Sequence, residues 1–159
     1  MDKKVIIVLL LLLSSAVVAA YLKGNFSQAA QGGVRVIFGG ENAHSYDALV
    51  ADTIPTLAQG LSGRASLPPA TGMLFVFDPP RVETFWMHRM QFPIDIIWIR
   101  DGKVIGIQEN APVPQGLSTA TFPSPGIVSH VFEVPAGTAA RDGITMGTAV
   151  TIVGYGAKR

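Results

Sequence analysis

Short apolar runs separated by turn-forming residues fill the stretch from Gly72 to Glu109, which also holds both tryptophans. The runs are rich in β-branched and aromatic residues, a composition typical of strands. They predict four consecutive strands, over residues 73–77, 82–87, 94–100 and 103–108. Pro79 and Pro80 should end the first strand, because proline has no amide hydrogen to contribute to the ladder.

The dipeptide Asp101-Gly102 separates the last two runs, and Asp-Gly between apolar runs favours a two-residue hairpin turn. This turn sets Asp95 opposite Gln108, on a face that is otherwise mostly apolar. The other face of residues 94–100 is also apolar, so we expect this strand to be covered on both sides. A buried carboxylate without a partner is costly, and Gln108 is the nearest partner that this register offers to Asp95.

The remaining hydrophobic pattern predicts further short strands, over residues 34–38, 46–51, 127–134 and 148–153. Two short helices are expected, over residues 55–59, with Thr53 as the N-cap, and 139–142. Residues 110–125 contain four prolines and are expected to form a long loop. The fold class is therefore β-rich α+β: a single compact, mostly antiparallel, barrel-like sheet with two short helices.

The N-terminus carries an apolar segment, residues 5–22, directly after Lys3 and Lys4. As a helix it would be about 27 Å long, just enough to span a bilayer. Its most apolar part, residues 5–13, has the length of a signal-peptide core, and Val18-Ala19-Ala20 offers small residues for cleavage. Both interpretations stay open: a cleaved signal peptide or a signal-anchor helix.

Three segments follow from this reading. Residues 1–22 are the signal peptide or anchor, residues 23–33 a linker, and residues 34–159 a single β-rich domain. The two lysines should hold the N-terminus in the cytoplasm, so the domain is expected to be extracytoplasmic, either secreted or membrane-anchored. The membrane is then a partner of the N-terminal segment if that segment is not cleaved.

Charge and composition exclude several function classes. Of twelve basic and eleven acidic residues, Lys3, Lys4 and Asp2 lie in the first 22, which leaves ten of each sign in the remainder. Without a basic stripe, nucleic acid is not an expected partner. The absence of cysteine excludes disulfides and thiolate metal sites. No nucleotide-binding or serine-nucleophile motif is present, so we expect no cofactor.

A set of short motifs in a fixed order is similar to a known family. The motifs are Gly60-Leu61, Arg64, Gly72–Phe77, Phe85–Met87, Pro93–Ile96, Val131–Gly137 and Gly143-Ile144. Together, over about residues 47 to 153, they resemble the uncharacterised "ACR" ancient-conserved-region family, domain-of-unknown-function family one-nine-two. The resemblance implies a small β-rich domain behind an export or membrane segment, and no settled activity.

The chain departs from that family pattern at two places. His88, Arg89 and Met90 stand where the family usually has a basic residue, Asn and Thr, and Ser62 stands where it usually has Met. If the Asn-Thr pair belongs to a functional site, that site is altered in this chain.

Asp95 and Glu133 are the candidate catalytic residues, because both are carboxylates within apolar strands. Two carboxylates that flank one cleft, about 5–10 Å apart, can perform acid–base hydrolysis, as in glycosidases. The alternative is a structural role for both, with Asp95 held by Gln108 or backbone amides and Glu133 held by Arg64 or Arg141. Buried ion pairs also perturb the pKa values of carboxyls, so such a shift would fit the structural role as well.

The candidate ligand-binding residues are Trp86, His88, Arg89 and Arg64. Trp86 has polar neighbours and can stack on a sugar ring, whereas Trp98 lies among isoleucines and is expected in the core. The three histidines, His44, His88 and His130, have no helical metal-ligand spacing, so no metal site is predicted.

Three functional hypotheses remain. The leading one is an extracytoplasmic accessory domain, without enzymatic activity, that binds a small polar or glycan-like ligand such as a cell-envelope glycan. The others are a glycosidase-like hydrolase that uses Asp95 and Glu133, and a purely structural exported domain.

Overall fold

The computed structural model describes residues 33–40, 43–115 and 120–156. The predicted segment 1–22 lies outside these ranges. The chain divides into two compact units between Gly33 and Val34. The unit that begins at Val34 is described below. Within the described ranges, no helix has the length and apolar character needed to cross a membrane.

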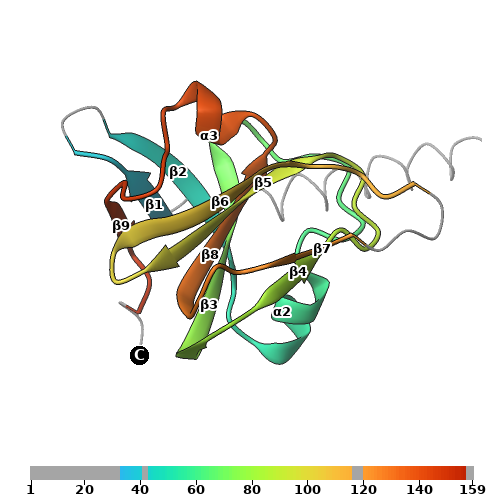
Figure 1. The fold of residues 1–159 in the computed structure, drawn as a ribbon, viewed down its shortest axis with the longest axis horizontal. Helices are drawn as coiled ribbons and strands as arrows, with labels where there is room; N and C mark the ends of the chain where they lie inside the picture. The colour runs from blue at the N-terminus through green and yellow to red at the C-terminus, as the bar shows by residue number, and fades with distance from the viewer. Residues whose placement is uncertain (1–32, 41–42, 116–119, 157–159) are drawn as a thin grey trace, which may run out of the picture. The chain divides into compact units, whose positions relative to one another are not determined.

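A seven-stranded sheet forms the centre of this unit (Figure 1). Its strands, in spatial order, are β6 (Lys103–Ala111), β5 (Ile94–Arg100), β8 (Val128–Pro135), β3 (Thr71–Arg81), β2 (His44–Ala51), β1 (Val34–Phe38) and β9 (Val150–Val153). Among the strand pairs of this sheet that the structure describes, only β2–β3 is parallel. The predicted β-rich, mostly antiparallel character is therefore confirmed.

The sheet curls until its two ends approach each other (Figure 1). The Val104 amide donates to the Thr148 carbonyl at 2.9 Å, and the Val150 amide donates to the Gly102 carbonyl at 2.8 Å. Lys103 also forms an isolated bridge with Ala149. The segment that enters β9 therefore contacts the start of β6, and the sheet takes the form of a half-barrel.

Apolar side chains cover both faces of the sheet. One cluster includes Phe38, Leu74, Ile97, Phe132 and residues from β9 and α3 (Thr138–Arg141), inside the curl. A second cluster lies on the opposite face, under α2 (Ile54–Gln59) and a small sheet of β4 (Thr84–Trp86) and β7 (Thr121–Pro123). All but the last residue of β5 are buried, which confirms that this strand is covered on both sides.

The two short helices occur close to where the sequence predicts them. The Thr53 hydroxyl accepts from the Thr56 amide at 3.4 Å, and the Thr56 hydroxyl accepts from the Thr53 amide at 3.0 Å. This capping box satisfies amide donors that a helix start would otherwise leave free. α3 has no side-chain cap of its own, and its first amides are bonded by Asp95 from β5 instead.

One strand boundary and one loop were predicted wrongly. β3 continues to Arg81 through Pro79 and Pro80, because its pairing with β8 is irregular between Val76 and Arg81 and needs no proline amide there. Residues 110–125 are not only loop, since they contain the end of β6 and the whole of β7.

The predicted pairing of Asp95 with Gln108 was also wrong. The turn itself is as expected, with Arg100 opposite Lys103 and Ile99 opposite Val104. The register then shifts by one residue, so Gln108 faces Ile96 and donates to the Glu109 carbonyl at 2.9 Å. A bulge of this kind adds an unpaired residue to one strand and moves every later side chain to the other face.

Candidate functional site

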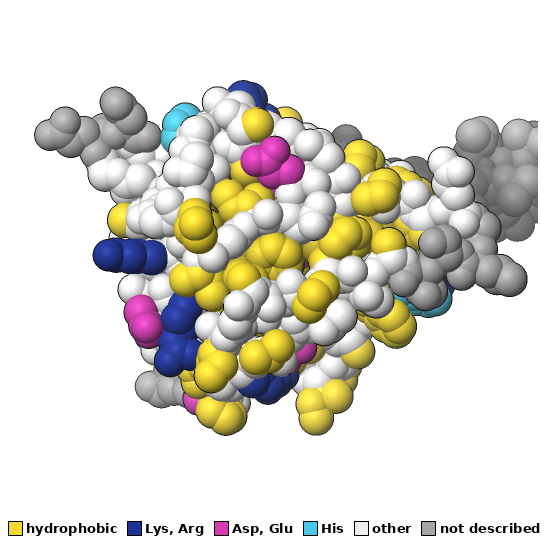
Figure 2. Space-filling view, in the orientation of Figure 1, with side chains coloured by type: hydrophobic (Ala, Val, Ile, Leu, Met, Phe, Trp, Pro, Cys, Tyr) yellow, Lys and Arg dark blue, Asp and Glu magenta, His cyan; other side chains and the backbone are white. Residues whose placement is uncertain are grey.

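A pocket opens between α2, the end of β3, and β4, with one residue of β8 in its lining. Its cavity volume is about 110 Å³. Its walls combine apolar and polar side chains. The apolar ones include Leu57, Leu61, Phe75, Phe77, Phe85 and Met90, and the polar ones are Gln59, Ser62, Arg81, Glu83, Thr84 and Glu133. We call this the Glu133 pocket. Figure 2 shows hydrophobic side chains on this face beside β4 and α2.

Glu133 is the buried charge-bearing group of the pocket. It lies on β8 opposite Met73 of β3 and Ile96 of β5, and only 4% of the residue is exposed. Burial raises the pKa of its carboxyl to about 8, because an apolar environment disfavours the charged form. Among the residues that the structure describes, no cation or hydrogen-bond donor contacts this carboxyl. The expected partner Arg141 pairs with Asp142 instead.

Trp86 lies at the rim of the pocket with 54% of its surface exposed. The alternation of β4 explains this position: Phe85 points into the core, where its ring packs edge-on against Phe75 at 4.9 Å, and Trp86 points outward. The ring of His88 packs against Trp86 with centroids 5.3 Å apart. An exposed indole beside a cavity offers an aromatic face to a ligand.

Hydrogen bonds join the two loops beside the pocket. The Ser62 hydroxyl donates to the His88 carbonyl at 2.8 Å, and the Gly63 amide donates to the Arg89 carbonyl at 3.0 Å. Arg81 and Glu83 form an ion pair on the other side of the rim. Of the predicted ligand-binding residues, Trp86 therefore lines the pocket and His88 and Arg89 lie in the loop beside it. Arg64 lines a separate surface depression with Thr56 and Met73.

Asp95 is fully buried and binds backbone amides rather than Gln108. One carboxylate oxygen accepts from the amides of Asn110, at 2.9 Å, and Gly137, at 3.2 Å, and the other accepts from Ala139, at 2.9 Å. Asp95 therefore fastens α3 and the end of β6 to β5. All its observed bonds are those of a structural residue.

The two predicted catalytic carboxylates do not face one cleft. In the β5–β8 pair, Glu133 is opposite Ile96, and Asp95 is opposite Val134. Because side chains alternate along a strand, the Glu133 and Asp95 side chains lie on opposite faces of the sheet. This geometry contradicts the hypothesis of an Asp95–Glu133 acid–base pair, because that pair needs both carboxyls on the same cavity.

A family comparison places this fold among known proteins. The model of the family described as "Uncharacterized ACR", DUF192, matches residues 35–152. The chain belongs to the DUF192 family. The resemblance inferred from the ordered motifs is thus confirmed. No curated protein matches the chain.

Two solved structures are similar to this DUF192 chain. A protein of unknown function from Novosphingobium aromaticivorans DSM 12444 is 34% identical, with a TM-score of 0.67, over 74% of this chain and 83% of that one. A protein from Sinorhizobium meliloti 1021, proposed to be a transcription regulator, is 32% identical, with a TM-score of 0.69, over 76% of this chain and 94% of that one.

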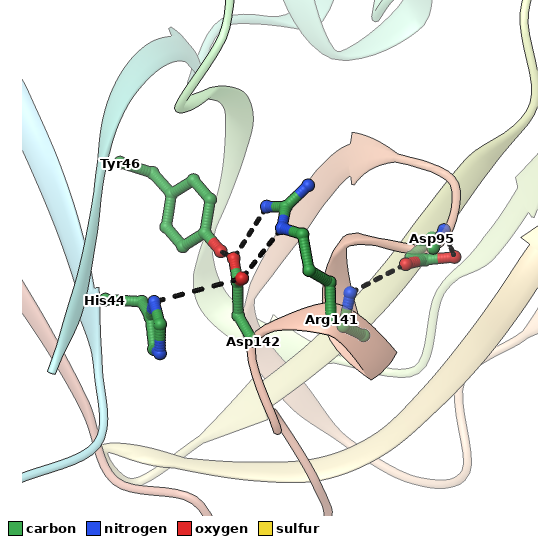
Figure 3. Close-up of polar contacts among 7 residues, drawn as sticks. His44, Tyr46, Asp95, Arg141 and Asp142 are labelled. Atoms are coloured by element: carbon green, nitrogen blue, oxygen red, sulfur yellow. Dashed lines mark hydrogen bonds and ion pairs between the residues drawn. The ribbon is translucent and has the colours of Figure 1, made fainter. Parts of the chain in front are cut away.

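The sequence analysis did not predict a second cluster of polar side chains in this DUF192 domain. Asp142, after α3, accepts a hydrogen bond from the Tyr46 hydroxyl. It also accepts two from the Arg141 guanidinium, at 2.8 and 2.7 Å, and one of its carboxylate oxygens lies 3.9 Å from a ring nitrogen of His44 (Figure 3). The bonds from Arg141 lower the pKa of Asp142 to about 2. Tyr46 and Asp142 are 96 residues apart in the chain, so no local sequence motif indicates that they interact. The Asp142 carboxylate is fully engaged, and it joins α3 to β2.

Among the described residues, no group of three or more histidine, aspartate or glutamate side chains is arranged to hold a metal ion. The Glu133 pocket is therefore the candidate site. It combines a cavity, an exposed aromatic ring and an unpartnered buried carboxyl.

Proposed function

We propose that this chain is an accessory domain outside the cytoplasmic membrane, secreted or tethered by its N-terminal segment, that binds a small polar, glycan-like ligand in the Glu133 pocket. The observation that carries the proposal is Glu133 itself. Its carboxyl lines the cavity and has no partner among the described residues, so its hydrogen-bonding capacity is left for a molecule that fills the pocket.

Trp86 supports the same assignment. A large exposed indole beside a cavity is available to stack on the apolar face of a sugar ring. We favour binding over catalysis because the second predicted carboxylate, Asp95, is committed to three backbone amides on the other face of the sheet.

We do not extend the role proposed for the Sinorhizobium protein to this chain. In the present chain, the residues after the N-terminal segment carry equal numbers of basic and acidic side chains. Binding to a nucleic-acid backbone depends on an excess of positive charge on one surface.

Thermal-shift measurements with neutral and amino sugars of the cell wall test the binding claim. A binding sugar should raise the melting temperature of the wild type, and Trp86→Ala should abolish the rise. Met146→Ala is the matched control, because Met146 is a large apolar residue, 75% exposed, that does not line the pocket. The absence of any shift with every neutral and amino sugar tested would end the binding claim.

Cell fractionation tests the location separately. We expect the domain in the periplasmic, envelope or secreted fraction, and accessible to added protease once any outer barrier is opened. Recovery of the intact chain as a soluble cytoplasmic protein would contradict the proposal.

A further inference from the structure

We propose that the ligand of the Glu133 pocket carries an organic ammonium group, a primary or secondary amine in its charged form, which pairs with the Glu133 carboxylate. This inference rests on the proposed function, since it names the chemical class of the ligand for the same pocket.

The charges of the lining favour a cation over an anion. Among the described residues that line the pocket, Arg81 is the one basic side chain, and Glu83 neutralises it by an ion pair. α2 and the loop after it contribute apolar, amide and hydroxyl groups but no charge. Glu133 therefore has no cation among its described neighbours, and an anionic ligand would find no free basic group in the lining.

The aromatic walls also suit a cation. Four aromatic residues line the pocket: Phe75, Phe77, Phe85 and Trp86. The guanidinium carbon of Arg81 lies 4.9 Å from the centroid of the Phe77 ring, so one of these rings already holds a cation over its face. Aromatic faces attract ammonium ions through the negative potential of the ring, and more strongly where water is excluded.

The size of the cavity limits the group that enters it. An apolar cavity of about 150 Å³ holds one benzene molecule. The cavity here, about 110 Å³, is somewhat smaller. It therefore admits a compact head of about five heavy atoms, while the rest of a larger ligand extends past Trp86 toward solvent.

Binding of an ammonium ion requires Glu133 to give up its proton. Because burial holds the pKa of the free carboxyl at about 8, the acid is mostly protonated at neutral pH. When the ligand binds, the carboxyl O–H bond breaks, the proton goes to solvent, and an ammonium N–H donates to the resulting carboxylate. Affinity should consequently rise with pH until the free carboxyl is ionised.

Few other groups complicate this titration. Arg81 and Glu83 are the other ionisable side chains that line the pocket, and His88 packs against Trp86 at its rim. The strands on either side of Glu133 place Met73 and Ile96 next to it, and neither ionises.

Isothermal titration of the purified full-length chain tests the inference. The compact probes are n-butylammonium and its neutral counterpart n-butanol, and the sugar probes are glucosamine, N-acetylglucosamine and glucose. We expect n-butylammonium and glucosamine to bind, with n-butanol, N-acetylglucosamine and glucose at least tenfold weaker. The affinity for n-butylammonium should rise nearly tenfold between about pH 6 and 7, with close to one proton released per ligand in buffers of different ionisation enthalpy.

Two variants make the test specific. Glu133→Gln keeps the shape of the side chain and should abolish binding of n-butylammonium and its pH dependence. Glu109→Gln, at an exposed position of β6 outside the pocket lining, should preserve both. Equal binding of charged and neutral probes, or unchanged binding by Glu133→Gln, would overturn the inference and leave the proposed function standing. No binding of any probe would overturn both.

Discussion

The contacts of Asp95 lead to the sharpest stability prediction. Asp95→Ala removes the acceptor for three backbone amides, those of Asn110, Gly137 and Ala139. A buried donor left without a partner costs about 1–3 kcal/mol. The bond to Ala139 is buried, and the other two are partly buried and can find water. We therefore assign about 2 kcal/mol to the first and about 0.5 kcal/mol to each of the others.

The expected loss for Asp95→Ala is then about 3 kcal/mol, or roughly 10 °C in melting temperature for a domain of this size. Asp95→Asn keeps one carbonyl oxygen but turns an amide NH₂ toward one of the donors. It should fall between wild type and Asp95→Ala, at a cost of about 1–2 kcal/mol.

Urea and thermal unfolding of the purified full-length chain measure these differences. Asp47→Ala is the control, because Asp47 is an exposed aspartate on β2 and should change stability by less than about 0.5 kcal/mol. If Asp95→Ala is as stable as wild type, Asp95 does not hold α3, and the structural role assigned to it is refuted.

Two further predictions concern β3 and its neighbour β8. A Cβ on Gly72 would lie 2.3 Å from the Phe132 ring and 2.7 Å from the Glu133 carbonyl oxygen, so Gly72→Ala should destabilise the domain by about 1–3 kcal/mol. Gly126→Ala, where a Cβ meets nothing within 4 Å, should unfold at nearly the wild-type urea concentration, and equal midpoints for both variants would contradict the packing described. The pKa of Glu133 is raised from 4.5 to about 8 in the folded state, so the contribution of this group to stability should be full below about pH 4.5 and fall as pH rises toward 8. Glu133→Gln should remove most of that fall in pH-dependent urea unfolding, and an unchanged pH profile would show that Glu133 is not the group responsible.

Local pattern was enough to predict much of this fold. β-branched and aromatic runs indicated most strands of the large sheet, the Asp101-Gly102 turn was found where expected, and Thr53 caps α2 as its sequence position suggests. The burial of Asp95 and Trp98 followed from the apolar residues around them. These features depend on neighbours within a few residues, which a sequence displays directly.

The features that the sequence did not reveal depend on distant contacts. The bulge after Val104 shifted the register of β6, and no turn residue marks it. Asp95 finds its donors 15, 42 and 44 residues away, so Gln108 was only the nearest candidate along a predicted ladder. The unpaired state of Glu133 depends on how α2 and β4 close over β3, which periodicity does not determine.

The most direct test of the central claim, that a ligand binds in the Glu133 pocket, is the indole N–H signal of Trp86 in a nitrogen-15 NMR titration of the full-length chain. The chain has two tryptophans, and Trp98 is 5% exposed and does not line the pocket, so its indole signal is an internal control. We predict that glucosamine or n-butylammonium shifts the Trp86 signal in a saturable manner and leaves the Trp98 signal nearly unchanged. If saturating concentrations of these ligands and of neutral sugars leave the Trp86 signal unmoved, the assignment of the binding site is wrong.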